Sequence, residues 1–320
     1  TKTAASELEV TAIARSCSTI VSDQKRSQTD RDYAASLLAW GLNRRGEMRS
    51  EQAAALVAKG MFPEAAKLDK YAADDFSTAV QFGPDNWRIR HNLAIALAMR
   101  NEYEQAIEQF SQAIDLKPDY PNAYFNRAEL HFELQDYSAA IADYTQAIEL
   151  NASDPQYYNS RGHAQFMREL YPEAIADYRR SVELGTDSAV YLTDLADAYQ
   201  FVGEWEQAAK AYRAALKLNS KLPRAYQNVA WLMATCPDAK LRNAELATTA
   251  AQKALELTGR GPSPQLLDVL AAATAASGNF SEAVRLQAQA VSTSSDASER
   301  VELQQRLQLY QNRRAYVQAE

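Results

Sequence analysis

Two arginine–aspartate combinations are the clearest candidates for chemistry in this sequence. Arg127 precedes Asp143 and Arg161 precedes Asp177 by the same number of residues, and both pairs fall at equivalent points of a repeat described below. An arginine half-buried between two helices needs a carboxylate partner, because an unpaired buried charge is strongly destabilising. We therefore predict two structural ion pairs, Arg127–Asp143 and Arg161–Asp177. A role for the two arginines in binding an anion is the alternative.

The remaining reactive side chains do not form a known catalytic or metal-binding pattern. The three histidines are spread along the chain without ligand spacing, and the two cysteines, Cys17 and Cys236, lie in no CxxC motif. The sequence contains no phosphate-binding loop, dinucleotide-binding GxGxxG, GxSxG, HExxH or calcium loop. His131 is expected to be a packed core histidine. The sequence thus predicts no catalytic residues, no metal site and no cofactor.

Small and aromatic residues recur every 34 residues through the middle of the chain. A repeat of this length is typical of stacked helix pairs, each of which buries its apolar face against its neighbours. The clearest ladders of small and aromatic residues are Ala106, Ala140, Ala174, Ala208 and Phe110, Tyr144, Tyr178, Tyr212. They define four units, 87–120, 121–154, 155–188 and 189–222.

These units resemble the tetratricopeptide repeat family. The best match is 189–222, with Leu195-Ala196, Tyr199, Gly203, Trp205, Ala208, Tyr212 and Ala215. The resemblance implies an all-α fold, a right-handed superhelical α-α solenoid of helix hairpins. Two looser units are expected over 223–297 and a capping helix over 298–320. Residues 1–86 are expected to hold an unpaired helix (9–22) and a degenerate repeat interrupted by an insertion (48–70).

The resemblance also places a partner-binding groove on the first helix of each unit. In this family the inner surface is lined at positions i, i+3, i+7 and i+10 of that helix, which form one helical stripe. With adjoining positions, the predicted groove residues are Arg88, His91, Met99, Asn122, Phe125, Asn126, Glu129, Phe132, Asn159, His163, Phe166, Met167, Asp197 and Phe201. Large apolar side chains with an acidic border favour a basic or amphipathic peptide or helix. Coverage of this strip by the N-terminal insertion is the alternative.

The family's dicarboxylate clamp for chaperone tails does not match this sequence. The corresponding positions hold His91, Ile95, Asn126, Gln156 and Ser160, and only Asn126 agrees with the clamp. We therefore do not expect binding of chaperone C termini.

Charge and hydropathy exclude further classes of function. The formal charge is −7 and no basic stripe is present, so binding to nucleic acid is not expected. No apolar run approaches the about 20 residues that span a membrane. The chain begins at Thr1 rather than Met, so we expect an upstream piece to have been removed. If that piece was a signal peptide the protein is exported, and otherwise a cytoplasmic location is expected.

The function that these observations favour is a protein–protein interaction scaffold or adaptor that is not an enzyme. One alternative is a structural or assembly factor that self-associates as a homo-oligomer. A lesser alternative is a regulator similar to the helical-repeat phosphatases, in which Gln165 or Glu129 would act.

Overall fold

The computed structural model describes residues 6–259 and 261–318, and in these ranges every regular element is an α-helix. The helices that precede the regular repeats are α1 (Glu7–Ser22), α2 (Gln28–Val57) and α3 (Phe62–Phe82). The regular repeats comprise α4 (Trp87–Met99), α5 (Tyr103–Leu116), α6 (Pro121–Glu133), α7 (Tyr137–Leu150), α8 (Pro155–Met167), α9 (Tyr171–Leu184), α10 (Ala189–Phe201) and α11 (Trp205–Leu218). The last helices are α12 (Pro223–Thr235), α13 (Ala244–Thr258), α14 (Pro264–Ala276), α15 (Phe280–Thr293) and α16 (Ala297–Gln311). The all-α helical repeat fold predicted from the sequence is confirmed.

The 34-residue period appears in the structure as evenly spaced helix starts. First helices begin at residues 87, 121, 155, 189 and 223, and three of these starts are prolines, whose fixed φ suits the first helical position. The short turn inside each regular hairpin contains one residue in the left-handed region. These residues are Asn101, Gln135 and Glu169, each with φ of 61°, and Gly203 with φ of 80°. Only the glycine adopts this conformation without a steric cost.

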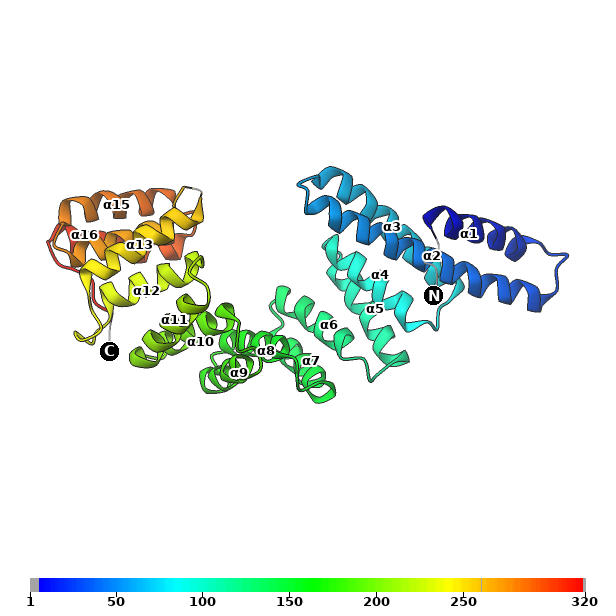
Figure 1. Cartoon of the computed structure of the whole chain (residues 1–320), viewed down its shortest axis with the longest axis horizontal. Coiled ribbons are helices and arrows are strands. Elements are labelled where there is room, and N and C mark those ends of the chain that lie inside the picture. The colour runs from blue at the N-terminus through cyan, green and yellow to red at the C-terminus, as the bar shows by residue number, and fades with distance from the viewer. Residues whose placement is uncertain (1–5, 260, 319–320) are drawn as a thin grey trace. The chain divides into compact units, whose positions relative to one another are not determined.

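The chain forms two compact units, which we call unit 1 (residues 1–153) and unit 2 (residues 154–320). Unit 1 contains α1 to α7 and unit 2 contains α8 to α16 (Figure 1). In both units the ladder alanines are completely buried, and the ladder aromatics are at most 2% exposed. Small residues therefore mark the closest approach of paired helices, and each aromatic ring fills the adjacent space.

The expected insertion at 48–70 does not form a separate element. It lengthens both helices of the preceding hairpin, because its alanine-rich sequence continues the helix up to the turn at Gly60. Helix α1 is not unpaired either, since Val10, Ala14 and Cys17 are buried and the latter two belong to a core shared with α2. The first three helices of unit 1 are thus one packed subassembly.

The capping helix α16 ends earlier than the predicted segment. Leu303 and Tyr310 are buried, as a cap over the last hairpin requires. Helix α16 stops at Gln311, and Arg313 adopts a left-handed conformation with φ of 56°, which redirects the chain. Residues 314–318, called the tail below, continue without regular structure.

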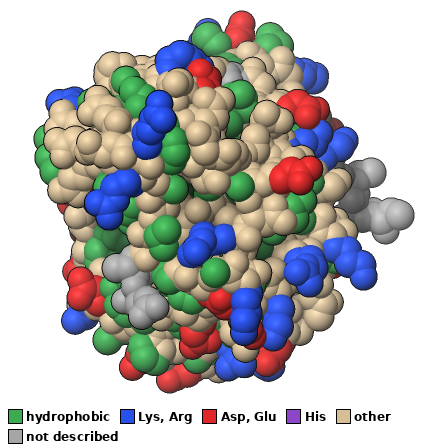
Figure 2. Space-filling view, turned by 90° about the vertical axis from the view of Figure 1, so that its left-hand side faces the viewer, with side chains coloured by type: hydrophobic (Ala, Val, Ile, Leu, Met, Phe, Trp, Pro, Cys, Tyr) green, Lys and Arg blue, Asp and Glu red, His purple; other side chains and the backbone are tan. Residues whose placement is uncertain are grey.

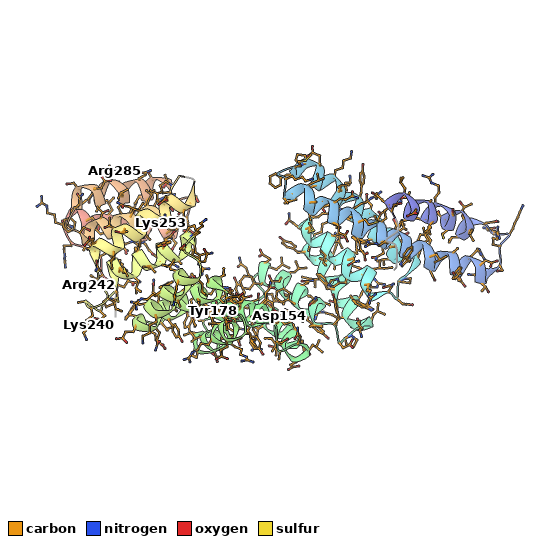
Figure 3. All side chains as sticks on the ribbon, viewed as in Figure 1. Asp154, Tyr178, Lys240, Arg242, Lys253 and Arg285 are labelled. Atoms are coloured by element: carbon orange, nitrogen blue, oxygen red, sulfur yellow. The ribbon has the colours of Figure 1, made fainter. Side chains whose placement is uncertain are left out.

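The surface of unit 2 carries charges of both signs. Figure 2 faces the C-terminal helices, where Lys and Arg side chains are interspersed with Asp, Glu and apolar groups. In Figure 3, Lys253 and Arg285 extend from α13 and α15, and Lys240 and Arg242 from the loop after α12. Arg285 and Lys253 are already paired with Glu282 and Glu256, at 2.5 and 2.9 Å.

Candidate partner-binding surface

Polar side chains connect the three consecutive first helices of unit 2. On α8, the Asn159 amide donates to Asp194 Oδ2 of α10 at 3.1 Å, and His163 Nε2 lies 3.4 Å from the same oxygen. On α12, Arg224 donates to Asp194 Oδ1 at 2.7 Å and also to Asp197. We call this set of side chains the inner-face network. It runs across α8, α10 and α12 without interruption.

Asp197 has three side-chain partners in the inner-face network. It accepts from the Tyr212 hydroxyl at 2.5 Å and from the Asn228 amide at 2.6 Å, in addition to Arg224. Burial raises the pKa of Asp197. Burial also acts to raise the pKa of Asp194, but the neighbouring His163 and Arg224 lower it overall. Two carboxylates thus share a single guanidinium, and His163 is the other basic side chain of this network.

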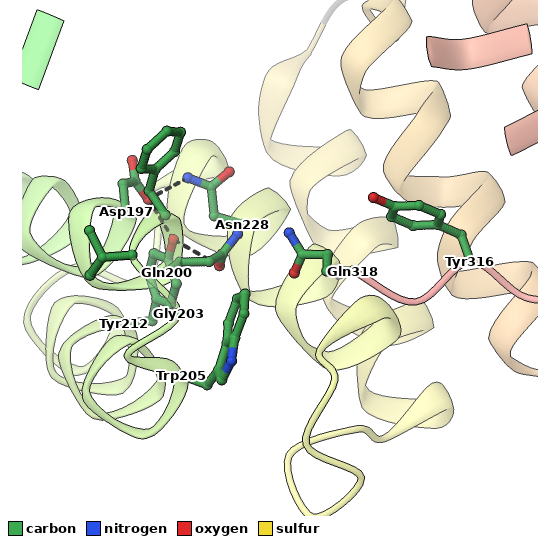
Figure 4. Close-up of a pocket in the computed structure, with 10 residues that line it drawn as sticks. Asp197, Gln200, Gly203, Trp205, Tyr212, Asn228, Tyr316 and Gln318 are labelled. Carbon is green, nitrogen blue, oxygen red and sulfur yellow. Dashed lines mark hydrogen bonds between the residues drawn. The ribbon is translucent and has the colours of Figure 1, made fainter. Parts of the chain in front are cut away.

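A cavity of about 580 Å³ adjoins this network (Figure 4). Phe201 and Trp205 contribute aromatic surface to it, and Asp197 and Asn228 contribute polar atoms. Phe201 is 60% exposed, which is unusual for a phenylalanine. The complete lining is Asp197, Gln200, Phe201, Val202, Gly203, Trp205, Tyr212, Asn228, Tyr316 and Gln318. We call it the inner-face cavity.

One wall of the inner-face cavity is the chain's own tail. The backbone N–H of Gln318 donates to the carbonyl of Thr235 at 2.8 Å, and the Thr235 hydroxyl donates to the Gln318 side chain at 3.2 Å. The ring of Tyr316 lies 5.7 Å from that of Trp231, and the Arg306 guanidinium is 5.5 Å from both ring centres. An irregular peptide segment therefore already lies against the first helix α12.

An aromatic cluster extends this surface toward the hairpin turns of unit 2. The ring centre of Phe166 lies 5.2 Å from that of Tyr171 and 4.9 Å from that of Phe201. The ring centres of Tyr171 and Phe201 are also 4.9 Å apart. Met167, beside this cluster in sequence, is 53% exposed. The sequence-predicted residues Asn159, His163, Phe166, Asp197 and Phe201 are thus brought together within unit 2.

In unit 1 several predicted groove residues are used for internal packing. His91 is only 8% exposed, and the centre of its ring lies 5.5 Å from that of Phe110 and 5.2 Å from that of Tyr120. Its Nε2 lies 3.2 Å from the amide nitrogen of Asn126. Burial lowers the pKa of His91, which favours its neutral form. Glu129 accepts a hydrogen bond from the Tyr144 hydroxyl. These polar groups are largely satisfied within the unit.

The predicted aromatic residues of unit 1 are half-buried rather than free. The ring centres of Phe125 and Tyr144 are 5.7 Å apart, and those of Phe132 and Tyr137 are 5.3 Å apart. Three other predicted groove residues are exposed: Met99, Arg88 and Asn122. The predicted groove in unit 1 therefore presents less free aromatic surface than the sequence pattern suggests.

Both predicted ion pairs are present inside their hairpins. Arg127 donates to both oxygens of Asp143 at 2.7 Å, and Arg161 donates to those of Asp177 at 2.6 and 2.9 Å. The two aspartates are 7% and 6% exposed. The hydrogen bonds that Arg127 donates to Asp143 raise the pKa of Arg127. The carboxylates occupy the forked edge of each guanidinium, as expected for structural pairs.

Comparisons with known proteins identify the repeat. The family models described as "TPR repeat" and "Tetratricopeptide repeat" match residues 96–135, 128–168 and 193–234. The chain is a multi-repeat tetratricopeptide repeat protein. Proteins of this family are in general protein-interaction scaffolds without catalytic activity, and no catalytic family is indicated for this chain. A search of curated proteins finds no match.

Solved structures with TM-scores above 0.5 share this helical repeat fold. A tetratricopeptide repeat protein from Parabacteroides merdae ATCC 43184 is 18% identical, with a TM-score of 0.54 over 83% of this chain and 99% of that one. The Cut9–Hcn1 complex of the APC/C matches with 18% identity and a TM-score of 0.52, over 82% of this chain and 52% of that one. A MamA structure is 21% identical over 53% and 91% of the two chains, with a TM-score of 0.48.

Some residues at this tetratricopeptide surface were not predicted from the sequence. Arg224 and Asn228 lie 34 residues after Val190 and Asp194, so extending the first-helix stripe by one unit would have found them. Tyr316 and Gln318 carry no repeat signal, because they reach the inner-face cavity only through the turn at Arg313.

Over residues 6–259 and 261–318, no group of three or more His, Cys, Asp or Glu side chains is placed to hold a metal ion. In the same ranges no helix combines the length and apolarity that a membrane crossing requires.

Proposed function

We propose that the inner face of unit 2 binds an extended segment of a partner protein that carries a basic side chain. The observation that carries this proposal is the tail. It lies without regular structure against α12, forms a backbone hydrogen bond to Thr235, and borders a cavity that Phe201 and Trp205 also line. The surface of first helices is therefore compatible with an extended backbone.

The shape of the inner-face cavity supports a peptide ligand. Its volume of about 580 Å³ can hold two or three side chains but not a folded domain. Phe201 and Trp205 offer aromatic surface on which an apolar residue would lose its contact with water. Gln200, Asn228 and Gln318 provide amides that could bond to the peptide backbone.

The charge balance of the inner-face network supports a basic residue in the ligand. Asp194 and Asp197 carry two carboxylates, and Arg224 is the cation that contacts both. An additional Lys or Arg from the partner would give these two carboxylates a second guanidinium or ammonium partner. Such complementarity acts mainly on specificity and association rate.

We expect Phe201→Ala to weaken binding of such a peptide at least about ten-fold, because a central aromatic contact is commonly worth more than 1 kcal/mol at an interface. The probe is a set of peptides selected from a random phage-displayed library against the full chain. Their Kd values would be measured by calorimetry with the wild type and the variant. Most selected peptides are expected to contain a Lys or Arg beside an apolar residue.

Leu218→Ala provides a matched control for this experiment. Leu218 is 49% exposed, belongs to the same unit, and does not line the inner-face cavity. Its replacement should leave the Kd unchanged. Selected peptides that bind the Phe201 variant as tightly as the wild type would show that the inner face is not the binding surface.

A further inference from the structure

A second cavity lies in unit 1, where the lengthened hairpin of α2 and α3 meets α4. Its volume is about 250 Å³. It is lined by Glu47, Ser50, Glu51, Asp69, Phe76, Asn92, Ile95, Ala96 and Met99. Ser50, Glu51 and Asp69 belong to the segment that interrupts the repeat in the sequence. We call this site the hairpin cavity.

The floor of the hairpin cavity is apolar. Phe76 is 3% exposed and lies below, and Ile95 and Met99 of α4 are 37% and 61% exposed. These side chains form a surface on which the methylene stem of a long side chain can pack while its charged end reaches the rim.

The rim of the hairpin cavity is acidic and only partly neutralised. Glu47 is satisfied by Arg44 at 2.9 Å and by the amide of Asn43 at 2.8 Å. Glu51 lies 3.8 Å from the same arginine, and its side chain is 70% exposed. The residues that line the cavity include no Lys or Arg.

Asp69 is the carboxylate at the rim that lacks compensation. Among the described residues no hydrogen bond or ion pair reaches its side chain. Partial burial raises the pKa of Asp69, because the ionised form loses part of its hydration without gaining a partner. A cation placed beside Asp69 would provide the missing interaction.

We propose that the hairpin cavity binds a Lys or Arg side chain of a partner protein, with its stem on Ile95 and Met99 and its charged end between Glu51 and Asp69. This inference goes beyond the proposed function of unit 2. It concerns a different unit, and its acidic residues Glu51 and Asp69 lie outside the regular repeats. It also gives a role to the lengthened hairpin, whose extra turns supply the acidic rim.

Methyl NMR of the full chain labelled with ¹³C-methyl methionine would test this proposal directly. The chain has five methionines; Met99 lines the hairpin cavity, whereas Met233 lines a different cavity in unit 2. The probes are acetyl-Leu-Arg-amide and acetyl-Leu-citrulline-amide, which match in shape but differ in charge. We expect the arginine peptide to shift the Met99 methyl resonance saturably, and to bind at least about five-fold more tightly than the citrulline peptide. Met233 should not move.

A variant and its control would locate the charge effect. Glu51→Gln with Asp69→Asn should weaken binding of the arginine peptide about five-fold or more, whereas Glu64→Gln, an exposed carboxylate of α3 outside the cavity, should not. An unmoved Met99 methyl, or equal binding of the two peptides to the wild type, would overturn the proposal, and neither result depends on a variant. These outcomes leave the Phe201 experiment on unit 2 unaffected, so the two proposals can fail separately.

Discussion

Replacement of Asp143 by alanine is expected to destabilise the hairpin of α6 and α7 by about 3 kcal/mol. Arg127 is mostly buried, and it would lose both hydrogen bonds to this carboxylate while remaining charged. The bond from Arg127 to the Ser111 hydroxyl, at 2.8 Å, would compensate only a small part of this loss. Urea unfolding of the full chain, combined with hydrogen exchange on α6 and α7, would measure the effect, because repeat arrays can unfold in steps.

The double variant Arg127→Leu with Asp143→Gln should recover most of the lost stability. The preceding repeat carries Leu93 and Gln109 at these two positions, so the hairpin accepts this combination. Removal of both charges also avoids an unpaired buried ion. As a control, Glu149→Ala on the exposed side of α7 should change the free energy of unfolding by less than about 0.5 kcal/mol. A double variant as unstable as Asp143→Ala would refute the structural interpretation of the pair.

Replacement of Asp268 by alanine should release the C-terminal cap. Asp268 accepts from the Gln287 amide at 2.8 Å and from Arg306 of α16 at 2.9 Å, and all three side chains are buried or nearly so. Without the carboxylate, Arg306 retains its stacking on Trp231 and Tyr316 but loses its main ionic partner. We expect a loss of about 2 kcal/mol confined to α16 and the tail, measurable as amide exchange about thirty-fold faster there than in the wild type.

Asp268→Asn is the matched variant for this prediction, because it keeps an acceptor for Gln287 and should lose less stability than alanine. Burial raises the pKa of Asp268, so the folded chain retains this proton to a higher pH than the unfolded chain. The corresponding stability is present at low pH and is lost as the pH rises through the folded pKa. This pH dependence should be absent in Asp268→Asn. Exchange rates in α16 equal to those of the wild type in Asp268→Ala would contradict the assignment.

The regular repeats could be predicted because one physical constraint recurs in them. Each hairpin needs a small residue where its helices approach and an aromatic residue beside it. The burial of Ala174 and Tyr178 could therefore be predicted from their positions in the 34-residue repeat. The arginine–aspartate pairs were accessible for the same reason. A buried arginine is stable only with a carboxylate partner, so the arginine and aspartate positions change together from one repeat to the next. A comparison of neighbouring repeats reveals this correlation.

The irregular parts could not be derived in this way. The segment 48–70 reads as helix, but nothing in its composition says whether it adds a new element or extends existing ones. The contact between Gln318 and Thr235 depends on the left-handed conformation of a single residue, Arg313. Nothing in the sequence predicts this conformation, because arginine rarely adopts it. The helical stripe predicted which side chains share the inner face, but not that His91 would turn inward against Phe110 and Tyr120.

The left-handed turn residues have a consequence for how the array loses its structure. Gly203 adopts its left-handed conformation without strain. At the equivalent point of the two middle hairpins, the same conformation of Gln135 and Glu169 lowers the stability of each hairpin by about 1 kcal/mol. The boundary between the two compact units falls in the sequence between these same hairpins. In a nearest-neighbour description of a repeat array, the weakest links then lie in the interior rather than at the ends. Such an array is expected to begin unfolding at these two middle hairpins, instead of fraying inward from its termini.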